Sequence, residues 1–178
     1  MAIRKVRLED VPEMLEIYRF FVEQTAVSFE YVLPTCEEFT ERVRDHVAMY
    51  PWLIWEEEGK VLGYAYAGRA FERAAYSWCA EISCYLDESV RGKGIGRKLY
   101  AQIEEILLKQ GCRKVFAVVT SANQASVAFH KAIGYEQAAV FSKVGLKFGK
   151  WYDVIWLEKQ LCEDGLPEEF PQPWEEMQ

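Results

Sequence analysis

The sequence lacks any run of about 18 apolar residues, the length that a helix needs to cross a bilayer, so we expect no membrane span. No long apolar stretch follows the basic residues Arg4, Lys5 and Arg7, and a secretory signal is not expected either. The five cysteines are odd in number and contain no C-x-x-C pair, which favours reduced thiols over a disulfide framework. These absences together predict a cytoplasmic protein without a metal site.

Lysine and arginine are missing from residues 161–178, which contain six acidic residues and three prolines. Removing these six from the 28 acids of the chain leaves 22 acids against 21 Lys and Arg, a net charge of −1. A nearly neutral body gives no support to nucleic-acid binding. Internal repeats and linkers are also absent, so we expect one folded domain over residues 1–160 and an extended acidic, proline-containing tail over 161–178.

What the sequence does contain is a strand, a basic glycine run and a helix in direct succession. Residues 78–86 are aromatic and aliphatic and predict a strand, and Arg91-Gly92-Lys93-Gly94-Ile95-Gly96 follows. Apolar residues then recur at helical spacing up to Gly111, a C-terminal stop signal. Free N–H groups of a first helical turn, glycines without Cβ and neighbouring Arg and Lys side chains form an anion site suited to a phosphate or pyrophosphate.

Two familiar phosphate loops do not fit this run. A Walker loop requires four residues between its first glycine and Gly-Lys-Ser/Thr, and that spacing is absent. A dinucleotide fingerprint requires a third glycine where Arg97 stands. The spacing that is present, Arg91-x-x-Gly94-x-Gly96, resembles the acyl-CoA pyrophosphate loop of the GCN5-related N-acetyltransferases, the GNAT family.

The other predicted elements surround this unit. We expect a strand at residues 3–7, and a helix from Asp10 with Glu13 as capping-box partner. A second helix begins at the capping box Thr35/Glu38 and extends to about residue 49, followed by a hairpin of residues 52–56 and 61–67. A central strand at 115–119, a short helix at 123–132 and two strands near 135–143 and 152–160, separated by residues 145–151, complete the domain. This order predicts a mixed α/β domain around one sheet.

That order is also similar to the GNAT order, and several blocks narrow the resemblance to phosphinothricin N-acetyltransferases and their methionine sulfoximine/sulfone relatives. They are Thr25 to Phe29, Tyr50 to Leu53, Gly63 to Gly68, Ala75-Tyr76-x-Trp78, Ala80-Glu81-x-Ser83-x-Tyr85, Ser126 to Tyr135 and Gly145-x-Lys147-x-Gly149-x-Trp151-x-Asp153. Together they cover roughly residues 3–160. The resemblance implies a GNAT fold, with a central, mostly antiparallel, twisted sheet that splays at the acyl-CoA site.

The resemblance implies acetyl-CoA as cosubstrate, with its pantetheine arm in the gap that opens after Glu81. The residues it assigns to the cofactor are the main chain of Cys84, Tyr85 and Leu86, the loop Arg91, Gly92, Lys93, Gly94, Ile95, Gly96 and Arg97, and also Asn123 and Ala132. Asn123 has a plainer interpretation as the N-cap of the short helix.

Glu81 and His130 are the candidate catalytic residues. An amine near pKa ~10 must lose a proton before it attacks a thioester, and a carboxylate such as Glu81 can accept that proton. Many GNAT members have a tyrosine at the place of His130 that is thought to protonate the departing thiolate, and a histidine near pKa ~6.5 can exchange protons at neutral pH. Which of the two is the principal base stays open.

For the acceptor, the resemblance implies contacts from Phe29, Arg73, Ala74, Ala75 and Tyr76. Some herbicide-detoxifying members have a basic residue near the place of Glu30, so phosphinothricin, a methionine derivative and another small amino acid all stay open as acceptors. Acetylation of protein or peptide N-termini and a non-catalytic acyl-CoA-binding module are the alternatives. Related enzymes are commonly dimers, and the apolar residues of the 145–151 segment predict a homodimer.

Overall fold

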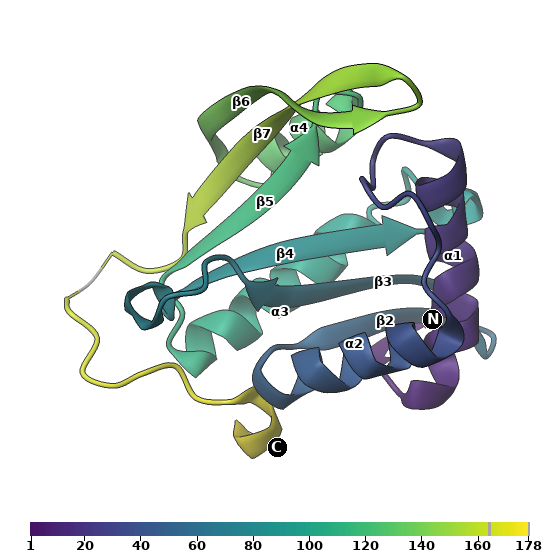
Figure 1. Ribbon diagram of the computed structural model, residues 1–178. Coiled ribbons are helices and arrows are strands. Elements are labelled where there is room, and N and C mark those ends of the chain that lie inside the picture. The colour runs from purple at the N-terminus through teal and green to yellow at the C-terminus, as the bar shows by residue number, and fades with distance from the viewer. Residues whose placement is uncertain (164, 178) are drawn as a thin grey trace.

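The protein, here a computed structural model described at residues 1–163 and 165–177, is built on one seven-stranded sheet in the order β1-β2-β3-β4-β5-β7-β6 (Figure 1). Only β4 and β5 are parallel neighbours, so the mixed, mostly antiparallel sheet is confirmed. The strands are β1 Ala2–Lys5, β2 Trp52–Glu57, β3 Lys60–Arg69, β4 Cys79–Leu86, β5 Lys114–Thr120, β6 Glu136–Lys147 and β7 Lys150–Gln160. The α-helices in the described residues are α1 Val11–Gln24, α2 Cys36–Met49, α3 Ile95–Gln110 and α4 Gln124–Ala132.

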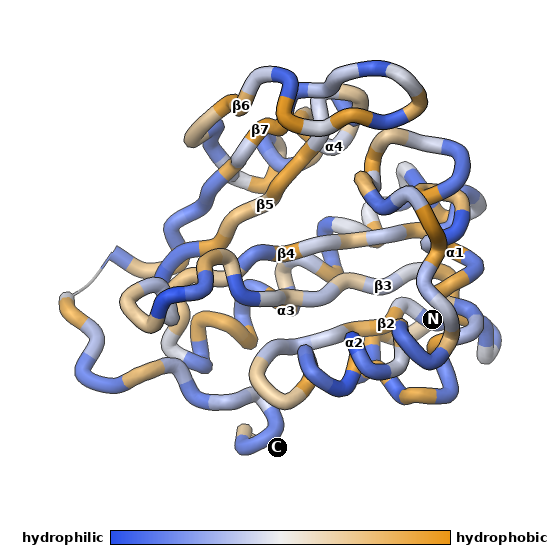
Figure 2. The backbone as a smooth tube through the Cα atoms, viewed as in Figure 1, coloured by the Kyte–Doolittle hydropathy of each residue, from blue (hydrophilic) through white to orange (hydrophobic). Residues whose placement is uncertain are grey.

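The helices cover the sheet on both faces. Side chains alternate along β2, so that Trp52 and Ile54 pack with α1 and α2 while Leu53 and Trp55 pack with α3. All four side chains are buried, which explains why this strand is an uninterrupted apolar run. β5 is likewise hydrophobic for most of its length (Figure 2). Within the described part of the chain, no helix combines the length and the apolar content that crossing a membrane requires.

The sheet opens between its two parallel strands. β4 and β5 pair only through the register Cys79 with Lys114, Ala80 with Val115 and Glu81 with Phe116. Beyond Glu81 the two strands diverge, β4 staying with β3 and β5 with β7 (Figure 1). From Ile82 onward, the β4 edge that faces β5 therefore has no strand partner.

One of the two expected capping boxes is confirmed and the other is wrong. Thr35 accepts a hydrogen bond from the Glu38 N–H (3.1 Å), and the Glu38 carboxylate accepts one from the Thr35 N–H (2.7 Å). Asp10 makes no side-chain cap on α1, because its carboxylate binds the Arg4 guanidinium at 2.7 and 2.8 Å. Glu13, its expected partner, instead accepts from the Val61 N–H of β3 (2.9 Å).

The segment 145–151, expected as a loop between two strands, is mostly strand. β6 extends to Lys147 and β7 resumes at Lys150, with a two-residue turn at Phe148 and Gly149. Both turn residues have left-handed backbone (φ 49° and 70°), the conformation that suits the twist of a tight hairpin. The expectation failed because glycines and lysines alternating with apolar residues resemble a loop until the partner strand is known.

The acidic tail contacts the domain at several of its described residues. The Phe170 ring stacks on Trp78 with centroids 4.8 Å apart, and the Trp78 indole N–H donates to the Glu169 carbonyl (3.1 Å). Trp174 is only 5% exposed and joins the core on the α3 side. Asp164, one of the six acids of the expected tail, and Gln178 lie outside the described residues.

Candidate active site

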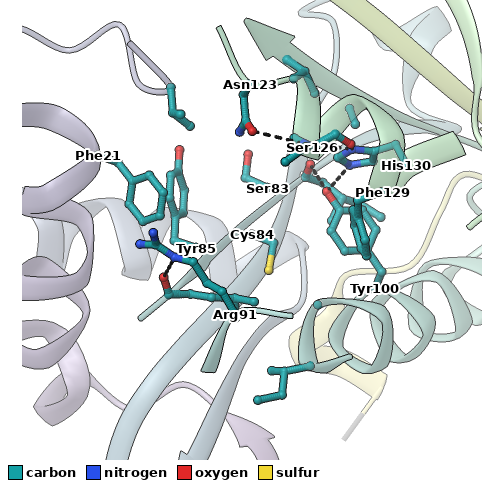
Figure 3. Close-up of a pocket in the computed structure, with 18 of the residues that line it drawn as sticks. Phe21, Ser83, Cys84, Tyr85, Arg91, Tyr100, Asn123, Ser126, Phe129 and His130 are labelled. Carbon is teal, nitrogen blue, oxygen red and sulfur yellow. Dashed lines mark hydrogen bonds between the residues drawn. The ribbon is translucent and has the colours of Figure 1, made fainter. Parts of the chain in front are cut away.

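A cavity of about 650 Å³ occupies the opening between β4 and β5 (Figure 3). α1 and the loop after it, β4, the glycine loop, α3, β5 and α4 all contribute to its wall. The lining residues are Phe20, Phe21, Thr25, Val27, Ile82, Ser83, Cys84, Tyr85, Leu86, Arg91, Gly92, Gly94, Ile95, Gly96, Arg97, Tyr100, Ala117, Val118, Val119, Thr120, Asn123, Ala125, Ser126, Phe129 and His130. Most of the predicted cofactor residues are therefore brought together by the fold.

The glycine loop has the backbone geometry that an anion site requires. Gly92 and Gly94 are both left-handed (φ 74° and 78°), and Gly94 is the N-cap residue of α3. A Cβ on either glycine would enter open space with no atom within 4 Å, which leaves the main chain accessible to a ligand. The unpaired N–H groups of the α3 first turn face the same region.

Of the four basic residues expected around this loop, Arg91, Lys93, Arg97 and Lys98, two line the cavity. The Arg91 Nε donates to the Leu86 carbonyl (3.1 Å), and its guanidinium lies over the rings of Phe20 and Phe21 at 4.9 and 5.1 Å. Arg97 lines the cavity and donates to the Ala132 carbonyl (3.2 Å). Lys93 and Ala132 themselves do not line it.

A glycine-to-alanine pair separates backbone strain from ligand binding. In Gly94→Ala, the alanine is strained by about 1–2 kcal/mol in the left-handed backbone conformation that Gly94 adopts. Relieving this strain changes the backbone, and it turns the N–H groups of the loop away from the ligand. We expect the Kd for acetyl-CoA, measured by calorimetry, to rise about 5–30-fold. Gly59→Ala is the matched control, since Gly59 has the same φ of 78° and the same open space but lies in the β2–β3 turn. Equal Kd changes in both variants would contradict the assignment.

The β4 residues expected at the pantetheine arm also line the cavity. Cys84, Tyr85 and Leu86 belong to the strand segment that has left β5, so one edge of their backbone is free to pair with an extended ligand. Burial raises the pKa of the Cys84 thiol to about 12. The thiol therefore stays protonated near neutral pH and is a poor nucleophile.

Asn123 has the geometry of both of its interpretations. Its side-chain oxygen accepts a hydrogen bond from the Ser126 N–H (3.1 Å), which makes it the N-cap of α4. The residue also lines the cavity. Since the cap uses only the oxygen, the amide nitrogen is left to serve a ligand.

Glu81 stands at the last paired position before the strands diverge. It is in register with Phe116 of β5 and Gly68 of β3, and Ile82 is the first β4 residue in the cavity wall. Burial raises the pKa of the Glu81 carboxyl to about 7. A carboxyl with that pKa takes up and releases a proton near neutral pH, as a general base must.

His130 belongs to α4 and is buried, with 4% of its surface exposed, yet it lines the cavity. Its Nδ1 lies 2.7 Å from the Ser126 carbonyl oxygen and its Nε2 lies 2.8 Å from the Tyr100 hydroxyl. Burial lowers the pKa of the imidazole, although the Ser126 bond partly opposes this effect. Both ring nitrogens are therefore already engaged within the protein.

Glu81 and His130 belong to opposite faces of the sheet. The register places Glu81 on the same face as Tyr66, Ser83 and Phe116, the face that α1 and α2 cover. His130 packs with Tyr100 on the α3–α4 face, and β4 and β5 part between the two sides. Two titratable side chains thus stand on the two sides of one gap.

The residues expected at the acceptor lie at two ends of the Glu81 face. Ala74, Ala75 and Tyr76 form a short 3₁₀ helix with exposed Arg73 as its N-cap. Tyr76 packs on Phe71, which in turn contacts Phe116 and Trp156 at 5.5 and 5.4 Å between ring centroids. Phe29, from the loop after α1, lies at the other end beside Tyr152 (6.4 Å).

Several cavity residues were missed from the sequence. Tyr100 was indistinguishable from the apolar stripe of α3, and Ser126 and Phe129 stood inside a block quoted only for its resemblance. Phe20 and Phe21 come from α1, which lies far before β4 in the chain. Among residues 1–163 and 165–177, His, Cys, Asp and Glu side chains nowhere form a group of three or more that could hold a metal ion.

Comparison with known proteins agrees with this geometry. The family model for an acetyltransferase (GNAT) domain matches residues 3–156. The chain is 37% identical over 162 residues to a phosphinothricin N-acetyltransferase of Alcaligenes faecalis (90% of this chain, 82% of the relative). It is 32% identical over 171 residues to an L-methionine sulfoximine/L-methionine sulfone acetyltransferase of Salmonella typhimurium (94% and 99%).

Among solved structures, the phosphinothricin acetyltransferase of Sinorhizobium meliloti in complex with acetyl-CoA superposes with a TM-score of 0.91 at 32% identity, covering 97% of this chain and 96% of that one. The expected GNAT fold is thereby confirmed. The chain belongs to the GNAT family of acetyltransferases, enzymes that depend on acetyl-CoA.

Proposed function

We propose that this enzyme transfers the acetyl group of acetyl-CoA to the amino group of a small amino-acid-like acceptor of the phosphinothricin, methionine sulfoximine or methionine sulfone type. The observation that carries the proposal is the opening between β4 and β5, with Glu81 on one face of the sheet and the glycine loop on the other. An amine and a thioester can meet there from opposite sides. The names of the relatives indicate the acceptor class.

In this proposal the bound cosubstrate supplies an activated acetyl thioester, and the chain positions and deprotonates its attacker. Glu81 takes the proton of the amine, because burial has raised the pKa of its carboxyl to about 7. A backbone N–H near Cys84 or Tyr85 polarises the thioester carbonyl. Direct attack is favoured over a Cys84 acyl intermediate, since that thiol stays protonated.

The acceptor is held on the Glu81 face between the aromatic group Phe71, Tyr76, Phe116 and Trp156 and the loop that carries Phe29. Arg73 is exposed beside this space and can pair with a carboxylate in bidentate fashion. Glu30 bonds Arg42 at 2.6 Å, so its charge is partly neutralised within the protein. The negative side chain still disfavours a phosphinate relative to a neutral sulfone.

An acceptor screen tests the proposal. Purified protein with acetyl-CoA should release thiol with L-methionine sulfone, L-methionine sulfoximine or phosphinothricin, and we expect the sulfone to give a higher kcat/KM than phosphinothricin. Free amino acids without a sulfone, sulfoximine or phosphinate group and short peptides are the comparison substrates. Activity on peptide N-termini alone, or no release above background with any small amine, would reject it.

We further infer a homodimer formed through the β6–β7 hairpin. Large apolar side chains on this hairpin are 42–60% exposed, namely Val140, Phe141, Val144, Leu146, Phe148 and Trp151. Several large exposed apolar side chains on one hairpin are typical of an interaction site. Sedimentation equilibrium should give twice the chain mass of 20.7 kDa, and Phe148→Lys with Trp151→Lys should shift it toward the monomer. The location in the cytoplasm stays a prediction.

A further inference from the structure

Tyr100 joins the imidazole of His130 to the edge of the gap. It belongs to α3, is 3% exposed, and its ring packs edge-on against those of Phe129 and His130. Its hydroxyl lies 2.8 Å from His130 Nε2 and 3.1 Å from the carbonyl oxygen of Ile82 (Figure 3 shows the His130 bond). Ile82 is the first residue of β4 after the strands part.

The contacts of His130 determine where its protons lie. A carbonyl oxygen only accepts, so Nδ1, at 2.7 Å from the Ser126 carbonyl, must carry a hydrogen. In the neutral imidazole, Nε2 therefore has the lone pair and accepts the Tyr100 hydrogen. Nε2 is thus already bonded to Tyr100 whichever charge the ring carries.

The single hydroxyl hydrogen of Tyr100 has two possible acceptors. Beside neutral His130 it points to Nε2, and beside the imidazolium it points to the Ile82 carbonyl while the tyrosine oxygen accepts from Nε2–H. Every polar atom of the trio is satisfied in the imidazolium state. The geometry therefore accommodates both protonation states of a buried histidine without moving a heavy atom.

We propose that Tyr100 is a further catalytic residue, through whose hydroxyl His130 delivers a proton to the departing sulfur. This inference rests on the proposed acetyl transfer. In the step, the Tyr100 O–H bond breaks as an S–H bond forms, and the His130 Nε2–H bond breaks as a new Tyr100 O–H bond forms. The thiolate becomes a thiol, the imidazolium becomes neutral, and Tyr100 ends as it began.

The surroundings of Tyr100 suit this role. Burial, with a contribution from the Glu81 charge, raises the pKa of the Tyr100 hydroxyl far above that of an ordinary phenol. The hydroxyl therefore keeps its proton between turnovers. A phenol of raised pKa is a weak acid by itself, but simultaneous transfer from the imidazolium avoids a free tyrosinate.

Other titratable groups lie around the Tyr100–His130 pair. Cys84 and Glu81 of β4 act electrostatically on the Tyr100 hydroxyl, and Tyr135 packs its ring 5.2 Å from the imidazole. Behind Tyr135, its hydroxyl donates to Glu104 of α3 (3.0 Å), which also binds Lys159 of β7 (2.6 Å). The charge of Glu104 is thus offset by Lys159. Tyr100 is the side chain that bonds Nε2 of His130.

The first test needs no turnover. Nuclear magnetic resonance titration of the ligand-free protein follows two histidines, His130 and, as internal reference, His46. In Tyr100→Phe both protonation states of His130 lose a hydrogen bond, and the imidazolium loses the stronger, charge-assisted one, so we expect the pKa of His130 to fall below its wild-type value. Tyr135→Phe removes a neighbouring buried hydroxyl that bonds Glu104 and should leave that value unchanged. An unchanged His130 titration in Tyr100→Phe, or equal shifts in both variants, would overturn the inference.

The second test is a double-mutant cycle on kcat. Tyr100→Phe and His130→Asn should each lower kcat about 10²-fold with the KM for acetyl-CoA unchanged, and the double variant should be no worse than either. Full kcat in Tyr100→Phe beside a loss in His130→Asn would reject the relay and leave the acetyl transfer standing. A wild-type protein inactive on every acceptor would instead reject the proposed function. In that case the His130 titration would still show whether Tyr100 and His130 are coupled.

Discussion

Glu81→Gln is expected to lower kcat/KM for acetyl transfer about 10²–10⁴-fold, the usual effect of removing a general base. The amide has nearly the same shape but accepts no proton from the amine. Glu81 faces the α1–α2 side and is not part of the cavity wall. The Kd for acetyl-CoA should therefore stay within about twofold of the wild-type value. Stopped-flow detection of released thiol and calorimetry measure the two quantities.

Glu158→Gln is the matched control, because Glu158 lies on the same face in register with Phe116 and pairs with Lys114 at 3.0 Å. Its variant should keep wild-type turnover. In the wild-type enzyme kcat/KM should fall as the pH drops through about 7, where Glu81 becomes protonated. A Glu81→Gln enzyme with wild-type rate and the same pH limb would show that another group, or water, accepts the proton.

The same replacement should change stability in a pH-dependent way. The folded pKa of Glu81 is raised from 4.5 to about 7, so the ionised carboxylate destabilises the fold and the free energy of unfolding decreases as pH rises between these values. The shift corresponds to about 3 kcal/mol at most. Urea unfolding should find Glu81→Gln more stable than wild type at pH 8 and equal to it near pH 4.

Lys147→Met carries the second large expected effect. The Lys147 side chain is 2% exposed in the protein, and its ammonium donates to the carbonyls of Val22 and Ser28, both at 2.6 Å. Val22 lies in the last turn of α1, where carbonyls lack helical partners and favour a cation. Methionine fills similar space but leaves both carbonyls unpaired, at about 1–3 kcal/mol each. We expect the free energy of unfolding to fall by about 2–5 kcal/mol.

This variant should also weaken acceptor binding. The Lys147 bonds hold the loop that carries Phe29 against β6, where the Phe29 ring packs so closely on Gly145 that a Cβ there would lie 2.2 Å from it. Loss of the clamp should therefore raise the KM for the acceptor more than the KM for acetyl-CoA. Lys150→Met, on the same hairpin but exposed, is the control expected to change neither. Equal effects at both lysines would contradict a clamp.

Local signals predicted the elements that form the proposed cofactor site. Neighbouring residues impose the backbone conformations of the glycine run, the helix after it and the Gly111 stop. These elements could therefore be predicted from the sequence. The Thr35 cap is local in the same way. The Asp10 cap failed because Arg4, on the neighbouring strand, offered its carboxylate a stronger, charge-assisted pair.

The acceptor half and the proton path depended on contacts between distant residues. Lys147 appeared in a segment that resembled a loop, and its role depends on carbonyls about 120 residues away. Tyr100 followed the apolar periodicity of α3, and nothing in that pattern distinguishes a ring that fills the core from a hydroxyl that bonds His130.

The sequence by itself determined the family, the cofactor loop and the two candidate proton-transfer residues, because these depend on residue type and short spacing. Only the tertiary structure decided that Glu81 and His130 lie on opposite faces of the sheet, with Tyr100 between the imidazole and the gap. The physical reason is that strand alternation assigns each side chain to a face, but the point at which two neighbouring strands part is set by the packing of the helices on both sides.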